Sequence, residues 1–346
     1  MITDITKLLR TNIASLKPYS TARDEYKGSL GIFLDANENP YENGLNRYPS
    51  PSQKEKVRAR IAEIKGVRPE NLFMGNGSDE AIDLCYRVFC EPRIDNAISI
   101  APSYGMYSVC ADINDVEFCT VRLREDFSLP VEELLQAADV HSKLMFLCSP
   151  NNPSANAYEP EQLLQLVERF DGMVIVDEAY IDFSGKGSLR GYVGKYPNLI
   201  VLQTLSKAYA MAGLRVGLAI ADEKVVSVFK QVKYPYNIGT DTLTHVEKNL
   251  EKDVAGQISE IKAQRETLSR ILPEFRCVEK VYPSDANFLL VKVTRARELY
   301  ERLIAEGLIV RDRSTTPGCE GCLRITVGTP AENLKLIDII SNYDRR

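Results

Sequence analysis

The stretch MVIVDEAY (residues 173–180) decides the fold, together with the segment NLIVLQTLSKAYAMAGLRVG (residues 198–217) that follows it. Each begins with a short apolar run of the kind found in strands that are buried on both faces. In sheets built from such strands, ligands bind in the crevice at the carboxyl ends of the strands. Because polar side chains follow both apolar runs, the pattern predicts an α/β fold with a ligand site at these strand ends.

Further apolar runs alternate with helical patterns along the chain. Helices are predicted at residues 160–170 and 222–231, among others, and strands at residues 96–101, 116–121, 143–149, 173–179, 198–204 and 215–221. This alternation indicates a mainly parallel sheet that is covered by helices on both faces.

The pattern changes after residue 240. Apolar residues at helical spacing from Leu243 to Ile261 predict one long amphipathic helix. Beyond it, runs at residues 286–293, 308–312 and 323–327, with helices at 295–306 and after Pro330, indicate a smaller α+β unit. We therefore expect residues 1–45 to join the small domain, residues 46–240 to form the large domain, and residues 241–346 to form a connecting helix and the C-terminal small domain.

Length and composition limit the class of protein. A chain of 346 residues with 44% hydrophobic content is long enough for one or two domains. A net charge of −5 argues against a nucleic-acid-binding protein, so local arginines must bind any anionic ligand. The chain has no apolar run of membrane-span length and its first ten residues lack the apolar core of a signal peptide, so we expect a cytoplasmic protein without a membrane partner.

The eight cysteines are scattered along the chain, and we expect them to be reduced. Four of them fall within apolar stretches, which is typical of core residues: Cys85, Cys90, Cys110 and Cys148. Cys319 and Cys322 form a single CxxC, which is a weak zinc signal because the chain has only two histidines to complete a site. We expect a loop there and no bound metal.

The two opening segments carry the groups that a pyridoxal phosphate ring requires. Asp177, at the end of a buried strand, would keep the pyridine nitrogen protonated, and a protonated ring accepts electrons from a breaking bond at an amino acid Cα. Lys207 would bond covalently to the cofactor if its pKa is lowered by desolvation and nearby positive charge. Arg215 suits the phosphate, and the hydroxyls of Thr204 and Ser206 precede the lysine. Either segment alone is equally consistent with a strand end or a solvated helix face, but together they favour a cofactor site.

The segment from Thr204 to Gly217 resembles the lysine segment of the fold type I, aspartate-aminotransferase-like enzymes. The chain as a whole resembles the histidinol-phosphate aminotransferases, from LKPYS (residues 16–20) to CLRITVGTP (residues 322–330). The resemblance implies a large domain with a mainly parallel, seven-stranded sheet covered by helices, and a smaller α+β domain built from the N- and C-terminal segments. It also implies pyridoxal 5'-phosphate as the cofactor, with Lys207, Asp177 and Tyr180 as the catalytic residues.

The resemblance assigns further residues to the cofactor. Gly77, Ser78 and Asp79 form a turn that opens a helix, where backbone N–H groups bind a phosphate, although such residues are also ordinary helix caps. Tyr104 would stack on the pyridine ring. Asn152 would bond to the ring oxygen beside Tyr180.

Two residues depart from the asparagine-proline signature of the family. In SPNNPSA (residues 149–155), Ser149 stands where Asn is often found and Ala155 replaces the usual glycine. We expect a modest change in the local turn.

Tyr48, in NRYPSP (residues 46–51), matches a residue that reaches the cofactor phosphate of the neighbouring subunit. The resemblance therefore implies a homodimer with shared active sites. A plain extended Tyr-Pro loop is the competing interpretation.

Four residues are implied in substrate binding. Arg324 matches the residue that holds the α-carboxylate in this superfamily, and an arginine between apolar strand neighbours is seldom left without a partner. Arg311 matches the residue that contacts the phosphate of histidinol phosphate, although it begins a charged stretch and could be solvated. Tyr19 and Asn37 would complete the phosphate pocket.

The resemblance implies transamination between L-histidinol phosphate and 2-oxoglutarate, giving 3-(imidazol-4-yl)-2-oxopropyl phosphate and L-glutamate, in histidine biosynthesis. The alternatives are a threonine-phosphate-decarboxylase-like lyase, an aromatic amino acid aminotransferase, and a non-catalytic α/β binding module that takes up no cofactor.

Overall fold

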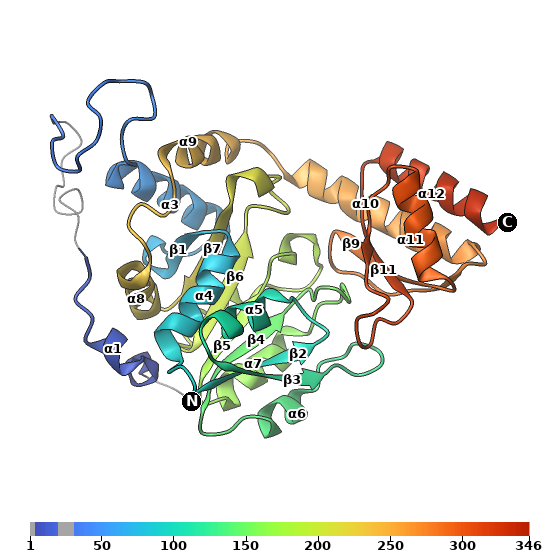
Figure 1. The fold of residues 1–346 in the computed structure, drawn as a ribbon, viewed down its shortest axis with the longest axis horizontal. Helices are drawn as coiled ribbons and strands as arrows, with labels where there is room; N and C mark the ends of the chain where they lie inside the picture. Colours follow the sequence, from blue (N-terminus) through green and yellow to red (C-terminus); the bar gives the residue numbers. More distant parts are fainter. Residues whose placement is uncertain (1–3, 20–30, 346) are drawn as a thin grey trace.

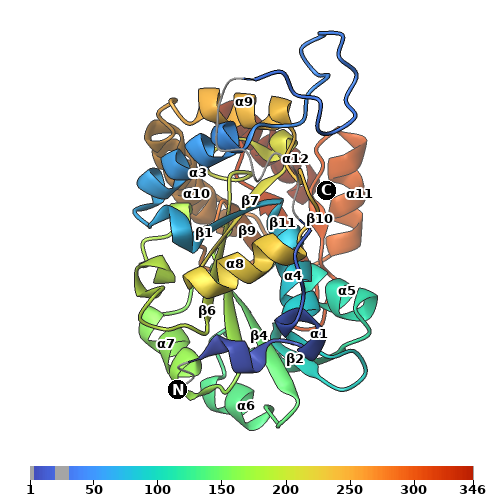
Figure 2. The ribbon, with the colours of Figure 1, turned by 90° about the vertical axis from the view of Figure 1, so that its left-hand side faces the viewer.

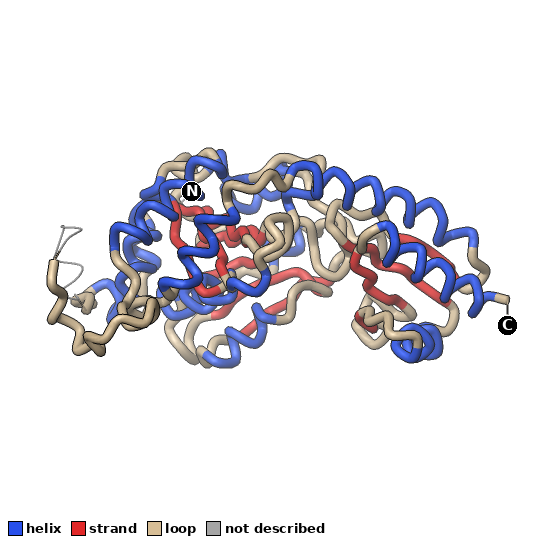
Figure 3. Tube along the Cα trace, turned by 90° about the horizontal axis from the view of Figure 1, so that it is seen from above, coloured by secondary structure: helices blue, strands red, loops and turns tan. Residues whose placement is uncertain are grey.

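The computed structural model describes residues 4–19 and 31–345. A large unit with a seven-stranded sheet and a small unit with a four-stranded sheet lie next to each other along the long axis of the molecule (Figure 1). Figure 3 shows helices around the strands of the large unit.

The large sheet has the strand order β1-β7-β6-β5-β4-β2-β3. Strand β7 is antiparallel to both of its neighbours, and the other pairs are parallel. The prediction of a mainly parallel sheet is therefore confirmed. The strands are β1 (Leu72–Asn76), β2 (Asn96–Ala101), β3 (Glu117–Arg122), β4 (Ser142–Cys148), β5 (Met173–Asp177), β6 (Leu199–Thr204) and β7 (Val216–Ala221).

Helices cover both faces of this sheet. Buried residues of α3 (Pro51–Lys65), α6 (Val131–Gln136) and α7 (Pro160–Arg169) share one core with one set of alternate strand residues. Residues of α4 (Ser78–Phe89), α5 (Met106–Ile113) and α8 (Glu223–Val232) share a second core with the other set. Val174 and Ile175 illustrate the division, because consecutive strand residues point to opposite faces.

The small sheet is antiparallel throughout, with the order β10-β11-β9-β8. Its strands are β8 (Val278–Val281), β9 (Phe288–Val293), β10 (Arg311–Asp312) and β11 (Cys322–Thr326). One face packs against α10 (Ala255–Ile271), α11 (Ala296–Ala305) and α12 (Pro330–Asp344). The short remaining helices are α1 (Thr11–Ala14) and the 3-10 helices at Ile5–Leu8, Pro69–Asn71, Ile181–Phe183, Leu189–Tyr192, Ala212–Leu214 and Leu272–Glu274.

The single long helix predicted after residue 240 is wrong. The structure has two helices, α9 (Thr240–Asn249) and α10, separated by residues 250–254. Leu243 of α9 packs in the core of the large unit, whereas Leu268 of α10 packs in the core of the small unit. The side chain of Asp253 accepts a hydrogen bond at 2.8 Å from the N–H of Ala255, the first residue of α10.

The described N-terminal residues contact the large unit, which differs from the expectation that residues 1–45 join the small domain. Ile5 and Leu8 are buried in the core beneath α4, and the N–H of Arg10 donates to the carbonyl of Val88 at 2.9 Å. Residues 31–48 lie beside α3 and α9, at the end of the molecule away from the small unit (Figures 1 and 2). The three-part division of the chain stays a prediction.

Candidate active site

A cavity of about 120 Å³ lies at the carboxyl ends of β4, β5 and β6, where Cys148, Asp177 and Thr204 line it. The sequence predicted twelve cofactor-binding residues. Eleven of them line this cavity: Gly77, Ser78, Asp79, Tyr104, Asn152, Asp177, Tyr180, Thr204, Ser206, Lys207 and Arg215.

One end of the cavity is suited to an anion. Gly77 precedes α4 with a φ of 80° and has no side chain to cap the helix, so the N–H groups of the first turn are available to a ligand. The carbonyl of Arg215 accepts a hydrogen bond from the N–H of Gly77 at 2.8 Å, which fixes the turn against β7. A Cβ atom on Gly217 would lie 2.0 Å from the nitrogen of Ser78, so only glycine permits this close approach.

Arg215 and Thr204 complete the anion end. Arg215 has a φ of 53°, in the left-handed region that side chains seldom adopt, and its guanidinium lies 3.7 Å from the carboxylate of Asp79. Thr204 accepts a hydrogen bond from the N–H of Ser206 at 3.1 Å, which orders the turn that leads to the lysine.

Asp177 is the buried acid of the site. Burial raises the pKa of Asp177 to about 6, although two hydrogen bonds favour its ionised form. The hydroxyl of Tyr107 donates to one carboxylate oxygen at 2.8 Å, and the N–H of Ala179 donates to the other at 3.1 Å. A cationic N–H group in the cavity would compensate this carboxylate, as a protonated pyridine nitrogen does.

Tyr107 was not among the predicted site residues. It lies three residues after Tyr104, on the first turn of α5, and the two rings make an edge-to-face contact with centroids 5.5 Å apart. Tyr104 precedes α5, so the spacing within APSYGMY does not place the two tyrosines on one face of a helix. The hydroxyl of Tyr104 itself donates to Asp79 at 3.0 Å.

Lys207 and Tyr180 both line the cavity. The Nζ atom of Lys207 lies 5.7 Å from the centre of the Tyr180 ring. Burial lowers the pKa of Lys207, and the charges of Arg324 and Arg215 lower it further. A larger share of the lysine is therefore neutral and able to act as a nucleophile or a base. Burial raises the pKa of the Tyr180 hydroxyl, which keeps it protonated as a hydrogen-bond donor.

Arg324 connects the cavity to the small unit. It lies on β11, and its guanidinium donates to the side-chain oxygen of Asn152 at 2.5 Å. Burial lowers its pKa, and the nearby charge of Arg311 acts in the same direction. Arg311 lies directly opposite Arg324 on β10, so the two predicted substrate arginines are neighbours.

The asparagine-proline turn shows why glycine is usual at position 155. Ala155 has a φ of 71° and is completely buried. Its N–H donates to the carbonyl of Asn151 at 2.8 Å, and its own carbonyl accepts from Asp285 at 2.8 Å. The backbone therefore keeps the turn geometry that glycine would adopt freely, with alanine in a strained conformation.

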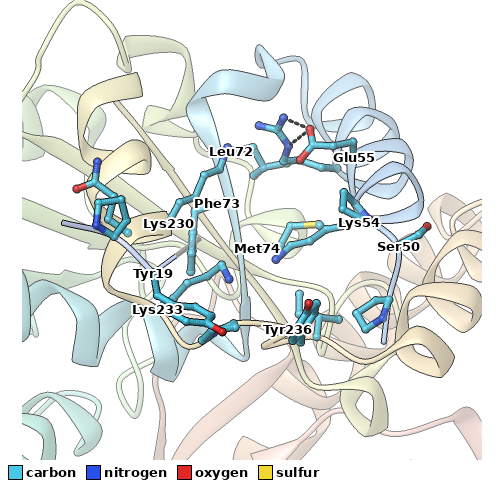
Figure 4. A pocket seen from close by; sticks show the side chains of 17 residues that line it. Tyr19, Ser50, Lys54, Glu55, Leu72, Phe73, Met74, Lys230, Lys233 and Tyr236 are labelled. Atoms are coloured by element: carbon cyan, nitrogen blue, oxygen red, sulfur yellow. Dashed lines mark hydrogen bonds and ion pairs between the residues drawn. The ribbon is translucent and has the colours of Figure 1, made fainter. Parts of the chain in front are cut away.

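Five predicted residues do not line the cavity, namely Arg311 and Arg324 of the small unit and the three N-terminal residues Tyr19, Asn37 and Tyr48. Tyr19 is 78% exposed and lines a separate cavity of about 370 Å³ between α3 and α8 (Figure 4). Asn37 is exposed on the segment of residues 31–48. Tyr48 stacks on Tyr236, with ring centroids 4.2 Å apart, and does not line the cavity of its own chain. The structure therefore does not bring Tyr19 and Asn37 to Arg311.

Cys319 and Cys322 are buried free thiols at one end of β11. Within residues 4–19 and 31–345, no cluster of three or more His, Cys, Asp or Glu side chains could hold a metal ion. None of the helices in the described ranges is both long and apolar enough to span a membrane.

The residues around the cavity fit pyridoxal phosphate. The uncapped helix end and Arg215 suit its phosphate, the buried Asp177 suits its ring nitrogen, and Asn152 and Tyr180 can donate to its ring oxygen. Lys207, with its lowered pKa, is the amine within the same cavity.

A sequence profile of the family described as "Aminotransferase class I and II" matches residues 34–340. The chain belongs to this aminotransferase family. A protein of Parabacteroides distasonis named histidinol-phosphate aminotransferase is 48% identical over 341 residues, which cover 98% of this chain and 99% of the relative.

Solved structures share the fold of this aminotransferase. Histidinol-phosphate aminotransferase from Clostridium acetobutylicum superposes with a TM-score of 0.79 and 21% identity, over 87% of this chain and 91% of the other. The enzyme of the same name from Sinorhizobium meliloti, solved in complex with pyridoxal-5'-phosphate, has a TM-score of 0.77 and 20% identity, over 86% and 84% of the two chains. The fold type I architecture expected from the sequence is therefore confirmed.

Proposed function

We propose that this aminotransferase uses pyridoxal 5'-phosphate to exchange the amino group of L-histidinol phosphate with 2-oxoglutarate, in the cytoplasm and as a step of histidine biosynthesis. One observation carries the proposal. Asp177, Lys207 and Arg215 line one cavity at the strand ends, in a chain that is 48% identical to a histidinol-phosphate aminotransferase over nearly its full length.

The cofactor, when bound, supplies an electron sink for the bond that breaks at the substrate Cα. Asp177 would hold positive charge on the ring nitrogen, and the hydroxyl of Tyr107 keeps that carboxylate oriented. The Nζ atom of Lys207 would accept the proton released from the substrate Cα and hold it for return, and its lowered pKa increases the neutral fraction that can accept a proton.

Arginines of the small unit bind the anionic ends of the substrates. Arg324 would hold the α-carboxylate of glutamate by a two-pronged contact. Arg311 would bind the phosphate of histidinol phosphate and, in the other half-reaction, the γ-carboxylate of glutamate. Tyr19 and Asn37 would join the phosphate pocket only if the N-terminal segment of one chain or its partner moves to it.

A homodimer is part of the proposal. The segment of residues 31–48 exposes large apolar side chains, including Ile32 at 90% and Leu34 at 85%, which one chain alone leaves in water. A second copy would cover them and bring Tyr48 to the partner's cofactor phosphate. Sedimentation equilibrium should give twice the chain mass, and a monomer at micromolar concentration would contradict this.

The first experiment identifies the lysine. Purified protein is loaded with pyridoxal phosphate and reduced with borohydride, which fixes the cofactor to the amine that it is bonded to. Peptide mapping should then find the label on Lys207 alone. A label on another lysine, or no uptake of the cofactor as expected for a non-catalytic binding module, would overturn the site.

The second experiment separates the possible reactions. The loaded protein is offered histidinol phosphate, O-phosphothreonine or phenylalanine as amine, each with and without 2-oxoglutarate. We expect glutamate to form fastest from histidinol phosphate. Release of carbon dioxide from O-phosphothreonine would show a lyase, and a preference for phenylalanine would show an aromatic aminotransferase.

A further inference from the structure

A third arginine lies beside the two that the sequence predicts. Strand β10 pairs Arg311 with Arg324, and the ladder continues two residues further, where the N–H of Arg313 donates to the carbonyl of Cys322 at 2.9 Å. Alternate residues of a strand share a face, and directly paired residues lie side by side on it. Arg311, Arg313 and Arg324 therefore leave the same face of the small sheet.

This face looks towards the large unit. Leu290, which pairs with Arg324 across β9, packs in the core of the large unit, as does Cys322. The residues between them, Leu323 and Ile325, point the other way into the core of the small unit. The three arginines thus lie on the side of the sheet that faces the cavity.

No carboxylate neutralises these arginines in the part of the chain that the structure describes. Asp312 lies between Arg311 and Arg313 in sequence, but it points to the opposite face. There it accepts a hydrogen bond from the N–H of Ser314 at 2.8 Å and lies 3.9 Å from Arg297 of α11.

Arg313 is poorly solvated for an arginine without an acidic partner. Its side chain is partly buried, and its Nε atom is buried without a hydrogen-bond acceptor among the described residues. Burial lowers the pKa of Arg313, and the charges of Arg324 and Arg311 lower it further. A bound anion would relieve both the desolvation and the repulsion.

The two amine substrates, histidinol phosphate and glutamate, differ in the anion that this arginine cluster would bind. Histidinol phosphate carries its phosphate ester on the CH2 group that takes the place of the carboxylate of an amino acid. A phosphate has three terminal oxygens and a charge near −2, whereas a carboxylate has two oxygens and a charge of −1. Two guanidinium groups satisfy a carboxylate, but a phosphate dianion can accept hydrogen bonds from three.

We propose that Arg313 is the third cation of a phosphate subsite with Arg311 and Arg324, and that it makes this site favour a phosphate dianion over a carboxylate. The inference rests on the proposed function for its substrate. It assigns the selectivity between the two half-reactions to Arg313.

The test uses the holoenzyme with Arg313→Gln, which keeps a polar side chain and removes the charge. We expect kcat/KM for histidinol phosphate to fall about tenfold or more, the usual effect of losing a hydrogen bond between charged groups, and kcat/KM for glutamate to change less than about threefold. Arg313→Lys keeps the charge but lacks the planar guanidinium group, so its loss of kcat/KM for histidinol phosphate should be intermediate. Equal losses for both amines in either variant would show a structural role and overturn the proposal.

Arg297→Gln is the matched control. Arg297 lies on α11 at the opposite face of the same strand, where it pairs with Glu301 and Asp312. This variant should change both values of kcat/KM by less than about threefold, since only exposed ion pairs are lost. A selective loss of kcat/KM for histidinol phosphate in this control would contradict the assignment of selectivity to Arg313.

Inorganic phosphate separates this proposal from the proposed function. If the wild-type protein does not use histidinol phosphate, the proposed function fails, but the subsite is still tested by competitive inhibition of whichever amine is accepted. Arg313→Gln should then raise the inhibition constant of phosphate about tenfold and that of succinate much less. This difference should be larger at pH 8 than at pH 6, because phosphate becomes a dianion over that range. An unchanged inhibition constant for phosphate would overturn the subsite.

Discussion

Tyr107→Phe removes one oxygen atom from the buried surroundings of Asp177. The ring of Tyr107 is completely buried and stacks on Phe146 with centroids 4.9 Å apart, so phenylalanine should preserve the packing. Its hydroxyl donates to the Asp177 carboxylate at 2.8 Å. The substitution therefore tests how the protein stabilises a buried charge that the cofactor would otherwise compensate.

The size of the effect follows from the pKa of Asp177. Burial raises this pKa from 3.8 to about 6, so ionising Asp177 in the folded protein without cofactor costs about 3 kcal/mol relative to the unfolded chain. Because the folded-state pKa is the higher one, the folded protein does not bear this cost below about pH 4, where Asp177 is protonated. The stability contributed by protonated Asp177 is lost as the pH rises through about 6. A hydrogen bond to a charged group contributes about 1.5–3 kcal/mol, so above pH 7 Tyr107→Phe should be less stable than the wild-type protein by that amount.

Urea unfolding of the cofactor-free protein at pH 5 and pH 8, at one protein concentration, measures this difference. We expect Tyr107→Phe to lose about 1.5–3 kcal/mol at pH 8, but only about 0.5–1.5 kcal/mol at pH 5, where the carboxyl group is mostly protonated. Tyr86→Phe is the control, because the hydroxyl of Tyr86 donates to a neutral carbonyl, that of Tyr107, at 2.9 Å. The control should lose about the same at both pH values. An equal loss at both pH values for Tyr107→Phe would refute a charged Asp177.

Three further predictions concern the cofactor and the substrate. Gly217→Ala should destabilise the protein by about 3 kcal/mol or more in urea unfolding, because its Cβ atom would overlap the nitrogen of Ser78, whereas Gly239→Ala, with open space around it, should change stability by less than about 1 kcal/mol. Tight cofactor binding and normal stability in Gly217→Ala would contradict the close approach. Lys207→Ala should lower the rate of keto product formation at least about 100-fold and abolish the borohydride label, and a retained rate would exclude it as the base. Arg311→Ala should raise KM for histidinol phosphate about tenfold while the dissociation constant of the cofactor stays within about twofold, and an unchanged KM would count against the phosphate pocket.

Local sequence patterns predict most of the large sheet. The run at residues 96–101 coincides with β2. Asp177 and Thr204 are the polar residues that end two of the apolar runs, and they indicate the edge of the sheet at which the cavity lies. Strand β1 was not predicted, because LFMGN is short and leads into the glycine turn before α4. Periodicity also continues across residues 250–254, although the apolar faces on either side belong to different cores.

The residues that sequence analysis missed act through tertiary contacts. Tyr107 matters only because α5 brings its hydroxyl to Asp177, and the sequence does not show this approach. Arg313 becomes notable only once β10 and β11 are paired in register, since RDR alone reads as a charged loop. Tyr19 and Tyr48 contact the large unit away from the cavity, and Asn37 is exposed.

The central claim is most directly tested by a single half-reaction. Protein loaded with pyridoxal phosphate is mixed with excess L-histidinol phosphate and no oxo acid, and the phosphorylated ketone is measured by mass spectrometry. The account predicts about one equivalent of ketone per chain, followed by a stop, with turnover and an equal amount of glutamate after 2-oxoglutarate is added. No ketone, or continued formation without an oxo acid, would contradict it.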